Sequence, residues 1–145
     1  MRLAGPVLGE RQMDEGQMRA RVAAASVARV ATLDAQGRAH LVPVVFVLDG
    51  DTLYSGSDAG PRVRRLRNLE RDRRVTVLVD AYDEDWSKVW WVRIRGQGRA
   101  VDDGPERDRA LRLLVDKYPQ FGGVPPDGPV MAVNVEEWAG WAYAP

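Results

Sequence analysis

Short apolar runs separated by polar turns recur along most of the chain, which is the pattern of antiparallel β-structure. Several runs are rich in β-branched residues, and the segment 34–37 between the first two has the composition of a tight turn. The runs lie at 27–33, 40–48, 52–55, 74–80, 89–101 and 130–135, followed by a tryptophan-rich segment at 137–143. Gly96 and Gly98 interrupt the longest run, where we expect β-bulges.

Three segments instead place apolar residues at helical spacing. They are 14–26 with Met18, Val22 and Ala25, 61–72 with Val63, Leu66 and Leu69, and 103–118 with Leu111, Leu114 and Val115. A doubly wound parallel sheet would need a helix after nearly every strand, and these helices are too few. We therefore predict a mainly β fold with short helices, a small antiparallel barrel that forms one domain over residues 1–145.

The expected second strand, 40–48, is apolar on both of its alternating faces. One face carries Val42, Val44, Phe46 and Leu48, and the other carries Leu41, Val45 and Val47. Because a small barrel has only one dry face, we expect a helix, a cofactor or a second subunit to cover the other.

The composition excludes several classes of function. The chain of 145 residues has no formal net charge and no cysteine, so disulfides, thiolate metal sites and thiol nucleophiles are ruled out. His40 is the only histidine and has no carboxylates at metal-ligand spacing, so we expect no bound metal. We also expect no nucleic-acid partner, no membrane span and a cytoplasmic protein. No nucleophile and base can be paired, so the catalytic residues stay unassigned and a cofactor would perform any chemistry.

One segment is electrostatically unusual. Seven arginines lie between Arg62 and Arg74, against two acidic residues. Pro61 after Gly60 predicts a helix that starts at the proline and leaves its first amide groups free for an anion. Arg64 and Arg65 would grip a phosphate there, and the hydroxyls of Ser55 and Ser57 could join them. A solvated basic face explains the same arginines, and the pattern alone leaves both readings open.

The tryptophans are concentrated late in the chain. Strand alternation makes Trp90 and Trp91 face opposite ways, so one of them should point out of the barrel, toward a partner subunit or a planar cofactor. Packing in the core or at an interface is the alternative. We take Trp91 as the cofactor-facing candidate.

Six short stretches together resemble a known family. They are Ala28–Asp34, Gly37–Val44, Gly50–Tyr54, Arg64–Leu69, Arg74–Asp80 and Trp91–Gly98. Their order and spacing resemble the split-barrel flavin and deazaflavin enzymes related to pyridoxamine 5′-phosphate oxidase, especially the coenzyme F420-dependent branch.

The resemblance implies a split β-barrel and a cofactor bound between the two subunits of a homodimer. A Ser-Arg-Lys pattern that holds the cofactor phosphate in the family corresponds here to Val63, Arg64 and Arg65, so the serine is lost and the lysine is an arginine. The backbone of Val30, Ala31 and Thr32 and the neighbourhood of Pro43 and Val44 would border the ring and its ribityl chain.

The resemblance also implies an oxidoreductase. The deazaflavin coenzyme F420 carries a phosphodiester and a polyglutamate tail, so arginines beyond a single phosphate site favour it over flavin mononucleotide (FMN). The predicted reaction is hydride transfer to a small conjugated substrate. The alternatives are an FMN-dependent enzyme of the same family and a non-catalytic flavin carrier or sensor.

Overall fold

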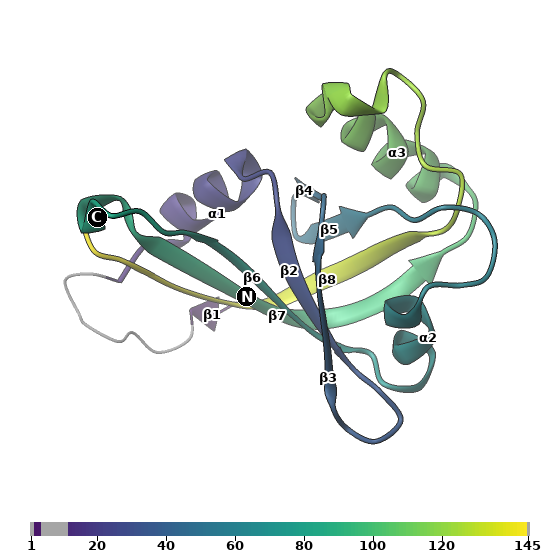
Figure 1. The fold of residues 1–145 in the computed structure, drawn as a ribbon, viewed down its shortest axis with the longest axis horizontal. Helices are drawn as coiled ribbons and strands as arrows, with labels where there is room; N and C mark the ends of the chain where they lie inside the picture. The colour runs from purple at the N-terminus through teal and green to yellow at the C-terminus, as the bar shows by residue number, and fades with distance from the viewer. Residues whose placement is uncertain (1, 4–11, 145) are drawn as a thin grey trace.

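One curved antiparallel sheet organises the computed structural model, which describes residues 2–3 and 12–144 (Figure 1). Its strands are β1 (Arg2–Leu3), β2 (Ala28–Leu33), β3 (Ala39–Val44), β4 (Val47–Asp49), β5 (Thr52–Ser55), β6 (Arg74–Ala81), β7 (Trp90–Val101) and β8 (Val130–Ala142). The helices are α1 (Glu15–Ala24), α2 (Arg64–Arg71) and α3 (Pro105–Lys117), with 3-10 turns η2 at Trp86–Lys88 and η3 at Pro119–Phe121. The strand order is β3-β2-β6-β7-β8-β5-β4, with β1 parallel to β8. The predicted mainly β, antiparallel split barrel is confirmed.

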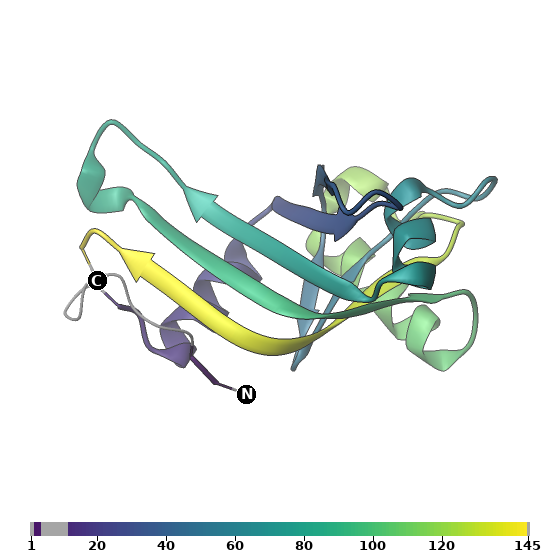
Figure 2. The same ribbon diagram turned by 90° about the horizontal axis from the view of Figure 1, so that it is seen from below.

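The long pair β7–β8 forms the middle of the sheet and carries one bulge (Figure 2). Arg95 pairs with Glu137 whereas Gly96 pairs with Val135, so Glu136 is the extra residue. The bulge expected at Gly96 is confirmed, and the one expected at Gly98 is wrong. Residues 130–135 and 137–143, separated in the sequence pattern, belong to one strand up to residue 142.

Two helices bury apolar residues against the sheet, as their helical spacing predicts. Asp14 and Gln17 form a capping box at the start of α1, and Met18 and Val22 are buried beneath it with Trp138. Helix α3 buries Leu111 and Leu114, together with Ala110, in a second cluster with Tyr54 of β5. Val115, expected on the inner face, is only half-buried.

A polar network fixes α3 to the sheet. Glu106 accepts two hydrogen bonds from the Arg99 guanidinium, at 2.8 and 2.7 Å, and one from the Tyr54 hydroxyl at 2.8 Å. Hydrogen bonding from Arg99 lowers the pKa of Glu106, while burial first and Glu106 second raise the pKa of Tyr54 to about 12. The network therefore joins β5, β7 and α3 through one carboxylate.

The arginine-rich helix is shorter than predicted. Pro61 was expected to be its first residue, but α2 begins at Arg64, and Val63 is an extended N-cap without a side-chain cap. Arg62 explains the delay, because its guanidinium reaches Glu70 at 2.9 Å and Asp102 at 3.1 Å from the extended backbone. The first-turn amides are consequently those of Arg64 and Arg65.

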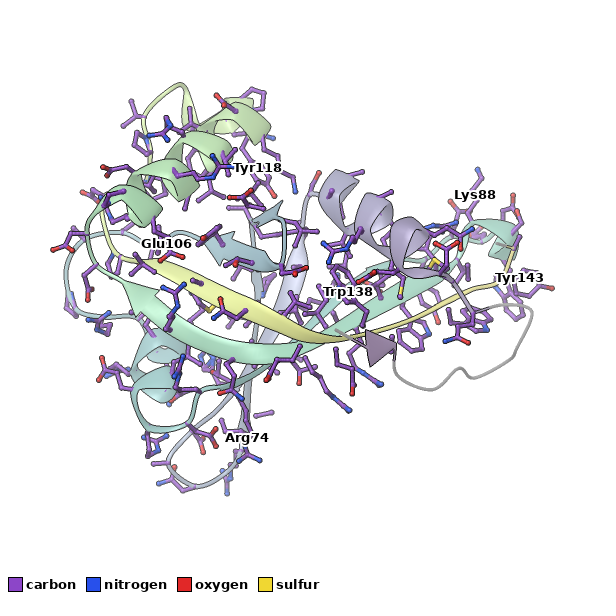
Figure 3. All side chains as sticks on the ribbon, turned by 180° about the vertical axis from the view of Figure 1, so that it is seen from behind. Arg74, Lys88, Glu106, Tyr118, Trp138 and Tyr143 are labelled. Atoms are coloured by element: carbon purple, nitrogen blue, oxygen red, sulfur yellow. The ribbon has the colours of Figure 1, made fainter. Side chains whose placement is uncertain are left out.

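The predicted strand 40–48 is two strands. After β3 the chain leaves β2 and pairs with β5, and Phe46 lies at the break. The Phe46 amide donates to the Tyr118 hydroxyl at 3.0 Å, and the Phe46 carbonyl lies 2.9 Å from the same hydroxyl. This side chain, at the end of α3 (Figure 3), replaces the strand partner that Phe46 lacks.

The outer face of these two strands is covered only in part. Val47 packs against the cluster beneath α3, as a covering helix would require. Leu41 and Val45 remain 64% and 39% exposed, and Pro43 between them is also exposed. This apolar strip has no cover within the described chain.

Close packing of α2 on β7 makes Gly98 sensitive to substitution. A Cβ at Gly98 would lie 2.6 Å from Val75 and 2.9 Å from Leu69, both in the core. We expect Gly98→Ala to lower the free energy of unfolding by about 1–3 kcal/mol in urea denaturation. Gly16→Ala, in α1, where a Cβ would make only an ordinary 3.4 Å contact with Asp14 Oδ1, should raise it by about 0.5 kcal/mol. Equal effects of the two substitutions would contradict this account.

Lys117 gives stability a pH dependence above neutrality. Its Nζ is buried 3.9 Å from the Phe46 ring centroid, and burial lowers its pKa from 10.5 to about 8. Between these values the unfolded chain holds the proton and the folded chain does not, so this group makes stability rise with pH. Lys117→Met should flatten the increase between pH 8 and 9.5 in urea denaturation, whereas Lys88→Met, at an exposed site, should not. Parallel profiles for wild type and Lys117→Met would refute the assignment.

Candidate functional site

The exit of β5 and the start of α2 bring three predicted residues together. The Arg65 guanidinium donates to the Gly56 carbonyl at 2.8 Å, and burial lowers the pKa of Arg65. Ser55 is buried on β5, and the Ser57 hydroxyl donates to the Pro129 carbonyl at 2.7 Å. In this arrangement Arg65 and Ser57 hold the backbone of the segment.

Arg64 points to a different place. It lines a shallow hollow of about 280 Å³ between α2 and the β2–β3 turn, together with Asp34, Ala35, Gln36, Arg67, Asn68 and Arg71. Arg62 and Arg74 pair with carboxylates, but no described carboxylate lies within 4 Å of Arg64, Arg67 or Arg71. Asp34 is the nearby negative charge; the backbone amide of Arg38 is the largest cause of its lowered pKa, and Arg64 is a smaller one. The hollow therefore carries an excess of positive charge.

The side chains of the β2–β3 pair alternate between the core and the outer face. Val30 and Thr32 point into the core, where the Thr32 hydroxyl accepts a 3.0 Å hydrogen bond from Asn68 of α2. Ala31 points outward, Pro43 is exposed and Val44 is buried. A molecule on the outer face would meet Ala31 and Pro43, and beside them the larger Leu41 and Arg29.

An outer groove of about 490 Å³ crosses β2, β3, β6 and β7. Ala31 and Thr32, which were predicted to border the cofactor, line it, whereas its other lining residues were not predicted. Its lining is Ala31, Thr32, Leu33, Ala39, Arg74, Val75, Thr76, Arg95, Gly96, Gln97 and Glu136. Its arginines are paired: Arg74 hydrogen-bonds Asp72, whose pKa falls to about 2, and Arg95 lies 3.3 Å from Glu137. Glu136 accepts a 3.4 Å hydrogen bond from Gln97 and has no cationic partner among the described residues. The alternation of arginines at 93 and 95 in the strand was the available sequence signal.

Trp91 lies apart from these residues. Trp90 packs against the core, so the prediction that the two rings face opposite ways is confirmed. Trp91 lies at the far end of β7, opposite Trp141, and the Arg93 guanidinium is 5.7 Å from its ring centroid. In one chain, the predicted site residues therefore lie in four separate places: the exit of β5, the hollow at Arg64, the β2–β3 pair and the end of β7.

A second loop clamps the segment 56–60, and sequence reasoning missed it. Gly128 donates to the Ser57 carbonyl at 2.8 Å, and the Ala59 amide donates to Asp127 Oδ1 at 2.8 Å. The Arg107 guanidinium holds the Gly128 carbonyl with hydrogen bonds of 2.9 and 3.1 Å. The turn-forming sequence Pro125–Pro129 was the only local sign of this structure.

Residues 2–3 and 12–144 contain neither a cluster of metal ligands nor a helix that could span a membrane. No group of three or more His, Asp or Glu side chains there is arranged to hold a metal ion. No helix in these ranges is long and apolar enough to cross a bilayer.

The clamp predicts a local effect of Asp127. Asp127→Ala removes the acceptor of the Ala59 amide, so hydrogen exchange should accelerate at residues 57–60 by at least about tenfold, with little change in β7. Asp127→Asn, which keeps an acceptor oxygen, should restore most of the protection. Unchanged exchange in Asp127→Ala, measured by mass spectrometry of peptic peptides, would show that Asp127 does not hold the loop.

Comparison with known proteins gives one family match. The model of the pyridoxamine 5′-phosphate oxidase family matches residues 14–142. A reductase of 5a,11a-dehydrotetracycline and 5a,11a-dehydrooxytetracycline from Streptomyces rimosus is 36% identical over 85 residues. That match covers 56% of this chain and 59% of the relative, so the chain spans little more than half of the relative's length.

Solved structures share the fold at low sequence identity. A conserved hypothetical protein from Mycobacterium tuberculosis superposes with a TM-score of 0.81 at 16% identity, over 96% of this chain and 90% of that one. An FAD-binding protein from Mesorhizobium loti gives 0.71 at 19% identity, over 90% and 95%. The family match spans nearly all of the described sheet and all three helices. The chain belongs to the pyridoxamine 5′-phosphate oxidase family.

Proposed function

We propose that this protein is a deazaflavin (coenzyme F420)-dependent reductase that transfers hydride to a small conjugated molecule. The cofactor lies between two subunits of a homodimer. The proposal rests chiefly on the three arginines of α2 that lack a carboxylate partner among the described residues. The family match and the named relative support it from outside the site.

The arginines fit an extended anion. Arg64, Arg67 and Arg71 follow one another at spacings of three and four along α2, so they form one stripe on the helix. One phosphate needs only one or two guanidinium groups, whereas a phosphodiester followed by a polyglutamate tail offers several negative charges. The stripe supports a deazaflavin more directly than FMN.

The named relative supports the type of reaction. The Streptomyces rimosus protein is a reductase of dehydrotetracyclines, which are conjugated polycyclic molecules. We extend the reaction class, but not the substrate, from that protein to this chain. When bound, the deazaflavin ring would supply the hydride.

The chain's own residues would bind and orient the cofactor. Arg64, Arg67 and Arg71 would hold its anionic groups, and the clamped segment 56–60 would keep Arg65 and the start of α2 in place. Ala31 and Pro43 would leave room for a flat ring against the strand backbone. Their apolar neighbours Leu41 and Val45 would exclude water from that face.

A homodimer would account for two features of the single chain. It would cover the apolar strip of Leu41, Pro43 and Val45, which the described chain leaves exposed. It could also complete the site, because Trp91 lies far from the start of α2 within one chain. FMN is the second candidate. Structural relatives from Mesorhizobium loti and Mycobacterium smegmatis are named FAD-binding proteins, which favours a flavin over a deazaflavin but does not distinguish FMN from FAD.

Cofactor titration tests the proposal. We expect the purified protein to bind F420 more tightly than FMN, and Arg64→Gln to weaken F420 binding by about tenfold because one charge-assisted contact is lost. Arg112→Gln, which removes an exposed arginine on α3, is the matched control and should bind like wild type.

The other outcomes identify the alternatives. Tighter binding of FMN, with a yellow preparation, would replace the cofactor and keep the fold. Tight F420 binding without turnover across a panel of conjugated acceptors would indicate a carrier or sensor. Unchanged affinity in Arg64→Gln would reject the α2 stripe as the anion site.

A further inference from the structure

An aromatic pocket lies at the end of the sheet farthest from α3, beside the labelled Tyr143 (Figure 3). It has a volume of about 320 Å³ and is lined by Tyr82, Trp86, Val89, Trp141 and Tyr143. The rings of Trp86 and Trp141 each meet Tyr143 edge-on, with centroids 6.2 Å apart. Tyr82 and Trp86 are 75% and 65% exposed, so these large rings wall an open space without filling a core.

Arg93 lies on the same face of β7 as this pocket, two positions beyond Trp91, and carries a buried polar atom without a partner among the described residues. Its guanidinium stacks on Trp91, and its Nε is buried without a hydrogen-bond acceptor. No described carboxylate lies within 4 Å of the Arg93 guanidinium. The nearby Asp80 is instead paired with Arg29 at 2.7 Å. A buried donor without an acceptor is uncommon in proteins, and it leaves the Arg93 guanidinium without a protein acceptor at this atom.

The pocket and Arg93 belong to one surface. Trp91 and Arg93 alternate with the inward residues of β7. Trp141, on β8, is the direct ladder partner of Trp91. Asp80 faces Trp91 from β6, which places Tyr82, two residues on, on the same side. The sequence of contacts from Arg93 through Trp91 to Trp141 therefore leads into the pocket along the outer face of the sheet.

We propose that this surface, which we call the acceptor site, binds the molecule that the enzyme reduces: a planar conjugated compound with an acidic oxygen, such as an enolate, phenolate or carboxylate. The identity of the ligand as the acceptor rests on the proposed function. Trp86, Trp141 and Tyr143 would enclose the ring, and Arg93 would bind the oxygen.

The size and charge of the site decide the class of ligand. A volume near 320 Å³ is at the lower end for small-molecule sites and suits a compound of two or three fused rings. Asp83, Glu84 and Asp85 lie on the solvated loop next to Trp86, and Asp85 already accepts from the backbone and hydroxyl of Ser87. The cation in contact with the aromatic surface is Arg93, so an anion should be preferred over a cation.

The test uses 2-naphthoate as the probe, with the neutral 2-naphthamide and the cationic 2-naphthylmethylamine as analogues. Calorimetric titration of the full chain without cofactor should give the order naphthoate, naphthamide, naphthylmethylamine. Arg93→Gln should weaken naphthoate by at least about tenfold and leave naphthamide unchanged, and Arg93→Lys should retain part of the preference. Trp86→Ala should weaken all three, and Arg112→Gln should change none.

The other outcomes would contradict either the acceptor site or the proposed function. Equal naphthoate affinity in wild type and Arg93→Gln, or tightest binding of the amine, would overturn the acceptor site. Loss of F420 affinity in Arg93→Gln as large as the loss of naphthoate would also overturn it, because Arg93 would then bind cofactor. If wild type binds naphthoate as expected but neither F420 nor FMN, the acceptor site stands as a binding site and the proposed function fails.

Discussion

The hydroxyl of Tyr118 occupies the point at which the sheet changes partners. Between β3 and β4 the chain must leave β2 for β5, and the backbone at Phe46 then has no neighbouring strand. The Tyr118 hydroxyl also lies 2.9 Å from the carbonyl of Ser26, two residues before β2. One oxygen therefore links the end of α3 to the break at Phe46 and to the segment that leads into β2. Without such a partner, a buried amide and carbonyl would be left unsatisfied at the centre of the fold. Together with the Glu106 network at its other end, this contact holds α3 on the sheet.

Local pattern was enough to place most strands and helices, because alternation and helical spacing are properties of neighbouring residues. It also established that Trp90 and Trp91 face opposite sides. The break at Phe46 was not predictable, since its cause is a tyrosine 72 residues away. The start of α2 was misplaced for a similar reason, because the carboxylate that holds Arg62 extended comes from Asp102, after β7.

At the candidate site, too, local sequence indicated the residue types, whereas distant contacts set their directions. Arginines near a helix start could be recognised from sequence, but their directions could not. Arg65 turns back to Gly56 and Arg64 faces the β2–β3 turn, although the two are adjacent. Pairing is also set by distant residues: Arg74 and Arg99 have carboxylate partners, whereas Arg64 and Arg93 have none within 4 Å among the described residues. Which arginines remain available to an anion is therefore a property of the folded chain.

The place of β8 in the sheet has a consequence for biosynthesis. This strand lies between β7 and β5, so the β4–β5 hairpin cannot join the sheet until residues 130–142 have been made. Roughly 75 residues separate the end of β5 from the start of β8, which corresponds to at least about four seconds of translation. Once β7 has also been made, the edges of β5 and β7 that β8 will occupy are both unpaired, so the incomplete chain exposes two strand edges open to intermolecular pairing.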